Sequence, residues 1–252
     1  MSPSLVETFT LPLSAGILAD FLSHQGIGAY FVGGVIRDSL LKIKTDDIDV
    51  AVEGNALIIG KAAASKLKGT YIELDRDRGI CRVVVAGEKG FQVDFVSANE
   101  GIKEDLARRD FTVDSMAIDI ESIRTNEGKV SFATSNLIDP LNGRRDLHLG
   151  KLRAVSSSSL ADDPVRLMRA VRLSSQYGFG LEDRTYGQIK HIAPQLKRIA
   201  PERIRDEFLK TLSLPRASES IRLMDKLGLL EQVIPEINQS RGIVQPKEHY
   251  WT

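Results

Sequence analysis

The stretch AYFVGGVIRDSLLKIKTDDIDVAV, residues 29–52, decides the fold of the first part of the chain. It begins with apolar β-formers, passes two glycines and an Arg-Asp pair, and ends in an acidic string that runs into a second apolar segment. This order predicts a strand at 30–32, a short helix at 35–41 and a strand at 48–52. A strand that needed only burial would not carry these acids, so their presence needs a separate reason.

Asp47 and Asp49 are expected to project from one face of the second strand, because residues two apart in a strand point to the same side. Ile48, Val50 and Val52 then point into the core. Neighbouring carboxylates repel unless a cation lies between them, and Mg²⁺ binds a few carboxylates together with waters and phosphate oxygens. We therefore predict Asp47 and Asp49 as metal ligands, with a solvated acidic strand face as the alternative.

A third acid, Asp94, lies in the middle of a predicted strand at 91–96. If this strand is a neighbour of the strand at 48–52, three carboxylates converge on one side of one sheet, where they can hold two metal ions. Asp94 is then also placed to take a proton from an attacking hydroxyl. Such a site suits phosphoryl or nucleotidyl transfer. We predict catalytic roles for Asp47, Asp49 and Asp94.

Gly33 and Gly34 lie between the first strand and the short helix, where side chains would block the approach of a phosphate. Arg37 follows one turn later and is expected to reach a triphosphate. The segment is neither a Walker loop nor a dinucleotide fingerprint, since G-x-x-x-x-G-K-[ST] is absent and Gly26-Ile-Gly28 lacks a third glycine.

Length and pattern predict more than one domain. The chain has 252 residues, more than the ~100–200 of a usual single domain. Strands and helices alternate in the first part, and the pattern is helical after Gly150. The predicted fold is a mixed α/β head with a small sheet flanked by helices at 1–143, an all-helical neck at 144–212, and the start of a longer helical body at 213–252.

The charge distribution and the single cysteine limit the possible classes of protein. The formal charge is zero, but residues 144–216 carry 15 basic and 8 acidic residues, a net +7, and the remainder carries −7. This distribution fits a phosphate-binding surface or an ordinary solvated helical face. No apolar run is long enough to span a membrane, no signal peptide is evident, and the one cysteine, Cys81, is expected to be a buried thiol. These features predict a cytoplasmic protein.

The motifs resemble those of the bacterial tRNA nucleotidyltransferase and poly(A) polymerase family, often called class II. Residues 33–49 resemble the family's first motif, which binds triphosphate and Mg²⁺. Residues 105–112 resemble the second, which contacts the nucleotide sugar; residues 139–147 the third, a hinge; and residues 202–207 the fifth, a helix that braces the neck. The resemblance implies nucleotide contacts by Gly33, Gly34, Arg37, Asp38, Arg109 and Asp110.

A fourth block, residues 162–172, resembles the family's protein template for base choice. On a helix, Asp163 and Arg166 would lie one turn apart and face one ligand. A carboxylate accepts from an exocyclic amine and a guanidinium donates to a ring nitrogen, so the pair can select cytosine and adenine over uracil and guanine. Arg169 and Arg172 are expected to support the incoming nucleotide. Surface ion pairs at i, i+3 are the alternative.

The resemblance implies a Mg²⁺-dependent enzyme that adds C, A or both from CTP and ATP to tRNA 3′ ends. A poly(A) polymerase of the same family and a non-catalytic RNA-binding module stay open as alternatives. Asp114 stands where relatives commonly have Asn, and the short segment 95–107 raises the hypothesis of CC-only addition. The oligomeric state is left open.

Overall fold

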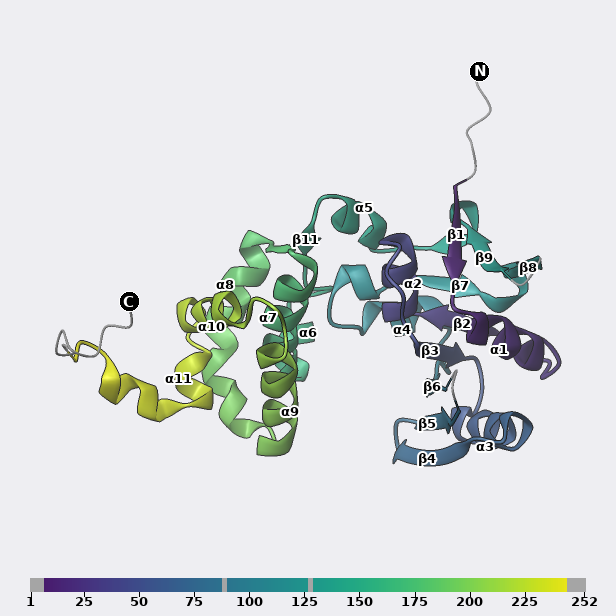
Figure 1. Cartoon of the computed structure of the whole chain (residues 1–252), viewed down its shortest axis with the longest axis horizontal. Coiled ribbons are helices and arrows are strands. Elements are labelled where there is room, and N and C mark those ends of the chain that lie inside the picture. The colour runs from purple at the N-terminus through teal and green to yellow at the C-terminus, as the bar shows by residue number, and fades with distance from the viewer. Residues whose placement is uncertain (1–6, 88–89, 127–128, 244–252) are drawn as a thin grey trace, which may run out of the picture. The chain divides into compact units, whose positions relative to one another are not determined.

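The computed structural model describes residues 7–87, 90–126 and 129–243. The chain forms two compact units, residues 1–149 and residues 150–252 (Figure 1). The finer division of the second unit into neck and body at residue 212 stays a prediction, and the end of that body, residues 244–252, lies outside the described residues.

Unit 1 is a mixed α/β unit, which confirms the predicted fold class. Its main sheet has seven strands in the order β10 (Leu137–Ile138), β7 (Ala117–Asp119), β2 (Ala29–Val32), β3 (Asp47–Val52), β6 (Phe91–Ser97), β5 (Ile80–Val85) and β4 (Thr70–Asp75). Its helices are α1 (Leu13–Ser23), α2 (Gly34–Leu40), α3 (Ala56–Leu67), α4 (Ile102–Ala107) and α5 (Gly143–His148). A second sheet, absent from the sequence prediction, has the order β1 (Thr8–Leu11), β9 (Lys129–Ala133) and β8 (Arg124–Asn126).

On one face of the main sheet, α3 covers the strands β4, β5 and β6. The Asn55 side chain starts this helix by accepting the backbone N–H groups of Leu57 and Ile58. Cys81 and Phe95 are fully buried beneath it, and a Cβ at Gly60 would lie 2.3 Å from the Cys81 sulfur, so only glycine lets helix and sheet approach this closely. Burial raises the pKa of the Cys81 thiol to about 11, as expected for a buried structural cysteine.

The opposite face of the sheet is covered at one end by α4. Ile102 and Leu106 of this helix form a buried cluster with Val32 and Ala51. Because residues two apart in a strand share a face, Asp49 lies on the same face as Ala51. The α4 helix therefore covers one end of the face that carries the acids, while Asp47 stays exposed and Asp49 is only partly buried.

Unit 2 is mainly helical. Its helices are α6 (Ser159–Asp162), α7 (Val165–Tyr177), α8 (Asp183–Ile192), α9 (Pro201–Leu212), α10 (Ala217–Lys226) and α11 (Leu230–Val233), with a 3-10 helix η4 (Ala193–Arg198). Gly178, with φ +71°, ends α7 in the left-handed conformation. The buried face of α7 packs against α9 and α10.

The expectation that this second part is entirely helical is wrong in one detail. The two-residue strands β11 (Lys151–Leu152) and β12 (Gly180–Leu181) pair in parallel. The pairing satisfies backbone groups where the chain enters unit 2 and where it leaves α7, since Gly180 N–H donates to Gly150 O and Glu182 N–H donates to Leu152 O. Segments this short carry no alternation from which a strand could be predicted.

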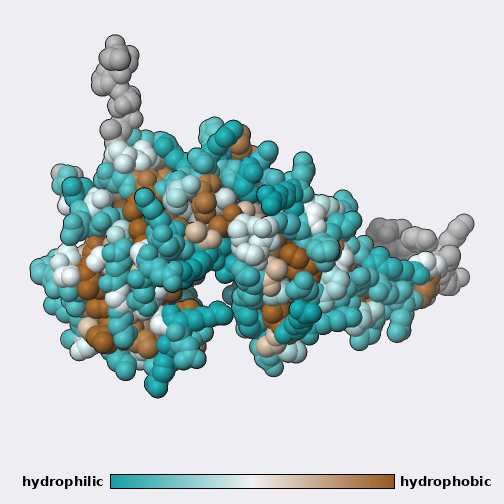
Figure 2. Space-filling view, turned by 180° about the vertical axis from the view of Figure 1, so that it is seen from behind, coloured by the Kyte–Doolittle hydropathy of each residue, from teal (hydrophilic) through white to brown (hydrophobic). Residues whose placement is uncertain are grey.

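Hydrophilic residues cover most of the face drawn in Figure 2, with smaller groups of hydrophobic residues between them. Among residues 7–87, 90–126 and 129–243, no helix has the length and apolar character that crossing a membrane requires.

Candidate active site

The predicted acids lie on two neighbouring strands. β3 and β6 pair in parallel, with Asp49 opposite Asp94 and Asp47 opposite Gln92. Residues opposite each other on paired strands project from the same face of the sheet, so Asp47, Asp49 and Asp94 share one face. The sequence-based expectation that the two strands are neighbours is confirmed; the catalytic and metal-binding roles of the acids stay predictions.

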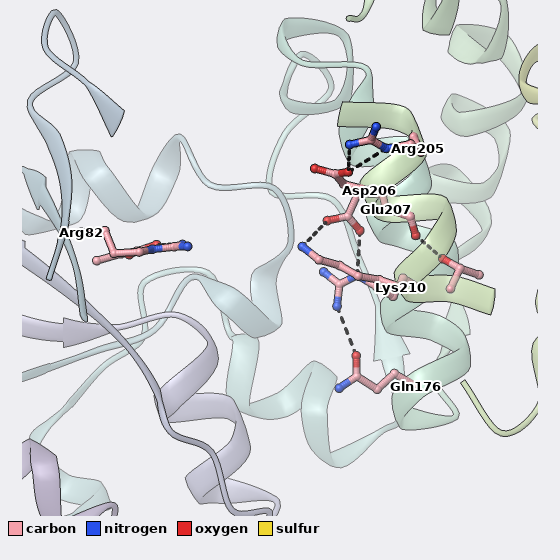
Figure 3. Close-up of polar contacts among 9 residues, drawn as sticks. Arg82, Gln176, Arg205, Asp206, Glu207 and Lys210 are labelled. Atoms are coloured by element: carbon pink, nitrogen blue, oxygen red, sulfur yellow. Dashed lines mark hydrogen bonds and ion pairs between the residues drawn. The ribbon is translucent and has the colours of Figure 1, made fainter. Parts of the chain in front are cut away.

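Arg82 of β5 is a fourth charged residue on this face. It lies opposite Asp94 in the antiparallel β5–β6 pair. Its Nε donates to Asp94 Oδ1 at 2.6 Å and its Nη2 to Asp94 Oδ2 at 2.7 Å, so the guanidinium holds both carboxylate oxygens. These hydrogen bonds raise the pKa of the Arg82 guanidinium, and the charges of Asp94, Asp47 and Asp49 raise it as well. Figure 3 labels Arg82, which sequence reasoning missed.

Asp47 and Asp49 suit Mg²⁺ by the chemistry of their oxygens. A protein usually gives this ion one or two carboxylates and leaves the other positions to waters and substrate phosphates. Within the part of the chain that the structure describes, no three His, Cys, Asp or Glu side chains are arranged to hold a metal ion by themselves. The predicted three-carboxylate site is therefore incomplete as it stands, because Asp94 is bound to Arg82. The two acids of β3 match the one or two carboxylates that a protein usually gives this ion.

Gly33 brings the acids and a second arginine together. It joins β2 to α2 with φ +71° and ψ −130°, a conformation that side chains strongly disfavour. A Cβ at this position would lie 2.8 Å from Arg109 Nη1 and 3.0 Å from Asp49 Oδ2. Arg109 is oriented from its other side by Asp105, one helical turn earlier, which accepts from Nε at 3.0 Å. The predicted residues Gly33, Asp49 and Arg109 thus lie side by side.

Arg37 and Asp38 lie beneath this glycine turn rather than on the surface. Arg37 is 6% exposed and Asp38 6% exposed. The Arg37 guanidinium donates from Nε to Asp38 Oδ1 at 2.9 Å and from Nη1 to Asp114, which is also buried. The arginine expected to grip a triphosphate is therefore held between two carboxylates, and Asp114, noted as a departure from the family pattern, is one of them. A direct phosphate contact by Arg37 or Asp38 stays a prediction.

The second motif shapes the backbone next to this turn. Asp110 is 7% exposed and its Oδ1 accepts the N–H of Phe111 at the start of the 3-10 turn η1 (Thr112–Asp114). Thr112 then donates to Asp146 of α5 at 2.7 Å, which ties the second motif to the third. These contacts give Asp110 a structural role, and its contact with a nucleotide sugar stays a prediction.

In unit 2, Asp163 does not lie on a helix as expected. It has an extended backbone, with φ −145° and ψ 91°, between α6 and α7. The helix begins only at Val165, because Pro164 disfavours helical backbone in the residue before it. The backbone oxygen of Asp163 still accepts the N–H of Arg166 at 3.0 Å, so the two residues lie one turn apart, with Asp163 in the capping position before Pro164. That their side chains face one ligand stays a prediction. The Asp163 carboxylate instead accepts two hydrogen bonds from Arg203 of α9, at 3.1 and 2.7 Å.

The three arginines of α7 differ in their surroundings. Arg166 donates to the backbone oxygen of Ser159 at 2.9 Å, and Arg169 is partly buried. Arg172 donates from Nε to Glu207 of α9 at 2.7 Å, in a pair whose side chains are 15% and 9% exposed. Figure 3 shows Lys210 beside Glu207, with which it forms an ion pair at 3.7 Å, and Gln176 farther away, where it accepts from Arg172 Nη1 at 3.2 Å. Arg172 thus ties α7 to α9, and its predicted contact with nucleotide stays untested.

Of two residues that sequence reasoning missed, one carried a usable signal and the other did not. Arg82 is a charged residue in the middle of the apolar string ICRVVV, and a hairpin between residues 80–85 and 91–97 would have placed it beside Asp94. Arg203 follows Glu202 in the fifth motif, but its pairing with Asp163 spans 40 residues and two helices. No local pattern predicts such a contact.

The chain matches two protein families and is similar in sequence to known tRNA nucleotidyltransferases. A family described as "Poly A polymerase head domain" matches residues 29–153, and one described as "Probable RNA and SrmB- binding site of polymerase A" matches residues 178–240. The chain is 36% identical over 230 residues to a CC-adding tRNA nucleotidyltransferase of Geobacter sulfurreducens, covering 91% of this chain and 50% of that protein. It is 37% identical over 228 residues to an A-adding tRNA nucleotidyltransferase of Deinococcus radiodurans, covering 88% and 49%.

A solved structure of a Thermotoga maritima CCA-adding enzyme complexed with tRNA superposes with a TM-score of 0.74 at 31% identity, covering 92% of this chain and 53% of that one. The chain spans about half the length of the curated relatives it matches. The motifs, the fold and both family matches lead to one conclusion: the chain belongs to the bacterial tRNA nucleotidyltransferase and poly(A) polymerase family.

Proposed function

We propose that this protein is an RNA 3′-end nucleotidyltransferase that adds C, A or both to tRNA without a nucleic-acid template. The tRNA 3′-hydroxyl attacks the α-phosphate of CTP or ATP, and pyrophosphate leaves. The observation that carries the proposal is the shared face of β3 and β6, where Asp49 lies opposite Asp94 and next to the Gly33 turn. Family membership supports the same reaction.

Asp47 and Asp49 are the residues that would hold Mg²⁺, which supplies charge neutralisation at the phosphates and stabilises the attacking and leaving oxygens. Gly33 lets Asp49 and Arg109 approach the turn closely, since a Cβ there would lie 3.0 Å from Asp49 Oδ2 and 2.8 Å from Arg109 Nη1. We expect the phosphates to bind in the space beside these two side chains. Arg109, fixed by Asp105, presents a guanidinium to the same space. These residues orient the triphosphate; none of them needs to form a covalent bond.

Base choice is assigned to Asp163 and Arg166 of unit 2. Cytosine and adenine both present an exocyclic amine beside an acceptor nitrogen, which a carboxylate and a guanidinium can pair. Asp163 is bound by Arg203, but that arginine side chain is 53% exposed, so the pair is weak enough to exchange for a base. Uracil and guanine would leave buried groups unpaired, which disfavours them.

The RNA is expected to meet the helices of unit 2. Arg184 and Lys190 of α8 and Lys197 and Arg198 of η4 are exposed, and all four fall within the family match to an RNA-binding region at residues 178–240. Exposed lysines and arginines bind the phosphate backbone without reading sequence, and duplex RNA is recognised mostly through its backbone and shape.

Asp49→Ala tests the proposed site. We expect incorporation of labelled CTP and ATP to vanish, because half of the β3 carboxylate pair is gone, while tRNA binding measured by filter retention or anisotropy is unchanged. Ser65→Ala, an exposed position on α3, is the matched control and should keep full activity. Incorporation by Asp49→Ala at the wild-type rate would refute the site.

The product distinguishes the members of the family. The wild-type protein is incubated with each of the four nucleotides and with tRNAs that end before, within and after CCA, and the products are sequenced. Addition of CC, of A or of CCA identifies the specificity. Long A-tails on unstructured RNA from ATP alone would instead identify a poly(A) polymerase. RNA binding without incorporation of any nucleotide would overturn the enzymatic proposal.

A further inference from the structure

We propose that Arg82 is a built-in counter-cation of the acidic face: it holds Asp94 in register beside Asp49 and competes with divalent cations for the carboxylates. It is a positioning residue, since it acts through Asp94. The inference rests on the proposed function, because it concerns the same acidic site, and it adds a residue outside the family-like motifs found in the sequence.

The geometry of the pair is the first support. Arg82 and Asp94 are direct neighbours across the β5–β6 ladder, so the backbone fixes their side chains on one face. The guanidinium spans both oxygens of the carboxylate, at 2.6 and 2.7 Å, in the fork geometry that sets orientation as well as charge. Both oxygens of Asp94 are therefore occupied in the structure. A metal ion can bind this carboxylate only by displacing a guanidinium nitrogen from one of its oxygens.

The charge balance of the face is the second support. Asp47, Asp49 and Asp94 project from one face of the neighbouring strands β3 and β6, with Asp49 directly opposite Asp94, and would repel one another in the absence of a cation. Arg82 interacts with all three through its charge, and a guanidinium stays protonated at every pH at which the protein is folded. Before any metal binds, the positive charge of Arg82 therefore reduces the repulsion among the three carboxylates.

The exposure of the pair makes the competition possible. The side chains of Arg82 and Asp94 are 33% and 29% exposed, so the pair lies at a boundary that solvent reaches. A divalent cation that arrives with a nucleotide meets carboxylates whose charge Arg82 already neutralises in part. The metal ion alone should therefore bind weakly. A triphosphate adds negative charge and should favour binding of the metal ion over the ion pair with Arg82.

Two substitutions test this inference. Arg82→Gln keeps polarity and Arg82→Met keeps the apolar stem; both remove the charge. We expect each to bind Mn²⁺, in the absence of nucleotide, about tenfold more tightly than the wild type, the effect of removing one positive charge roughly 6 Å from a divalent ion at a water-like dielectric. Calorimetry or the electron paramagnetic resonance signal of free Mn²⁺ measures the dissociation constant.

A second readout separates a counter-cation from a merely structural residue. Without metal, Arg82→Gln should unfold at a lower temperature than the wild type, because the acids are no longer compensated. Saturating Mn²⁺ should raise its melting temperature by more than that of the wild type, since tighter binding to the folded state gives greater stabilisation. A purely structural defect would persist with and without Mn²⁺.

Two control variants separate the effect of the charge of Arg82 from the effect of its position on the acidic face. Arg82→Lys keeps the charge but loses the fork, and its affinity for Mn²⁺ should stay within about twofold of the wild type, since the Coulomb contribution is retained. Arg76→Gln removes the same charge from an exposed ion pair with Glu73 and should leave Mn²⁺ binding unchanged.

Unchanged or weaker Mn²⁺ binding by both charge-removing variants, while Asp49→Ala loses binding, would overturn the role of Arg82 and leave the proposed site intact. Mn²⁺ binding by Asp49→Ala as tight as that of the wild type would instead overturn the metal site of the proposed function.

Discussion

Gly33 shows how one residue can meet a backbone requirement and a chemical one. Its φ of +71° places it where an L side chain is strained. The same position faces Arg109 and the Asp49 carboxylate, at distances from an ideal Cβ of 2.8 and 3.0 Å. The turn that directs the chain from β2 into α2 therefore also lets Asp49 and Arg109 come together against its backbone.

We expect Gly33→Ala to lower the free energy of unfolding by about 1–3 kcal/mol, the usual cost of a strained backbone conformation. Nucleotide incorporation should fall by about a hundredfold, because the new methyl group displaces Asp49 and Arg109, and small displacements in a site cost this much. Urea denaturation and steady-state incorporation measure the two effects.

Gly54→Ala is the matched control for this substitution, since its Cβ would meet only Ile27 Cγ2, at 3.9 Å. It should keep both stability and activity near the wild type. A Gly33→Ala protein with full activity would show that the close approach of Asp49 and Arg109 to this turn is not needed for nucleotide incorporation.

For single residues, the sequence predicts the features that depend on neighbours along the chain. Asp47 and Asp49 were found from strand alternation and Gly33 from its place between a strand and a helix, and both readings match the structure. Arg82, Asp114 and Arg203 were not found as partners, because each pairs with a residue on another element. The burial of Arg37 was missed for the same reason: its two carboxylates come together only in the folded unit.

Between elements, the pair of Arg172 and Glu207 fastens α7 to α9 in the core of unit 2. Glu207 is 7% exposed as a residue and also receives Lys210 at 3.7 Å. Removing one partner of a buried pair leaves the other charge uncompensated. The contact is therefore important for the helix packing of unit 2, whatever its relation to nucleotides.

Arg172→Met should lower the free energy of unfolding by about 3 kcal/mol, because Glu207 is left buried without its main partner. The double variant Arg172→Met with Glu207→Leu should regain much of this loss. Chemical denaturation of the four proteins in a double-mutant cycle gives the coupling energy. If Arg172→Met is as stable as the wild type but raises the KM for CTP, the arginine serves the nucleotide and not the packing.

Elements with clear periodicity were predicted well. β2, β3 and β6 were each expected within one residue of their bounds, because short runs of apolar β-formers identify them. The sheet of β1, β9 and β8 was missed, since two of its strands are three or four residues long and its pairing joins residues near 10 and 131. Short strands gain their stability from partners that the sequence does not reveal.

For the molecule as a whole, the separation of charge is the feature that bears on RNA. Residues 144–216 carry a net +7 while the rest of the chain carries −7. Most of the basic region belongs to unit 2 and the acids of the proposed site to unit 1. The proposed function therefore assigns contacts with the RNA backbone to unit 2, and contacts with the metal ions and the triphosphate to unit 1.

The affinity for tRNA should depend strongly on salt. If about four to six phosphates are neutralised, a plot of the logarithm of the association constant against that of the salt concentration has a slope of about −3 to −5. Substituting Lys197 and Arg198 of η4 by Gln should make this slope shallower by about 1 to 2 units. Anisotropy titrations at several salt concentrations measure it.

Lys66→Gln, an exposed position on α3, is the control and should leave the slope unchanged. A slope near zero for the wild type would exclude the basic region as the RNA-binding surface.

The parallel register of β3 and β6 restricts how this protein can change in evolution. Deleting one residue early in β6 would exchange Asp94 for Phe95, sending a carboxylate into the packed interior and a phenyl ring onto the polar side. Insertions and deletions should therefore accumulate in the connections around this sheet, while the number of residues within the two strands stays fixed.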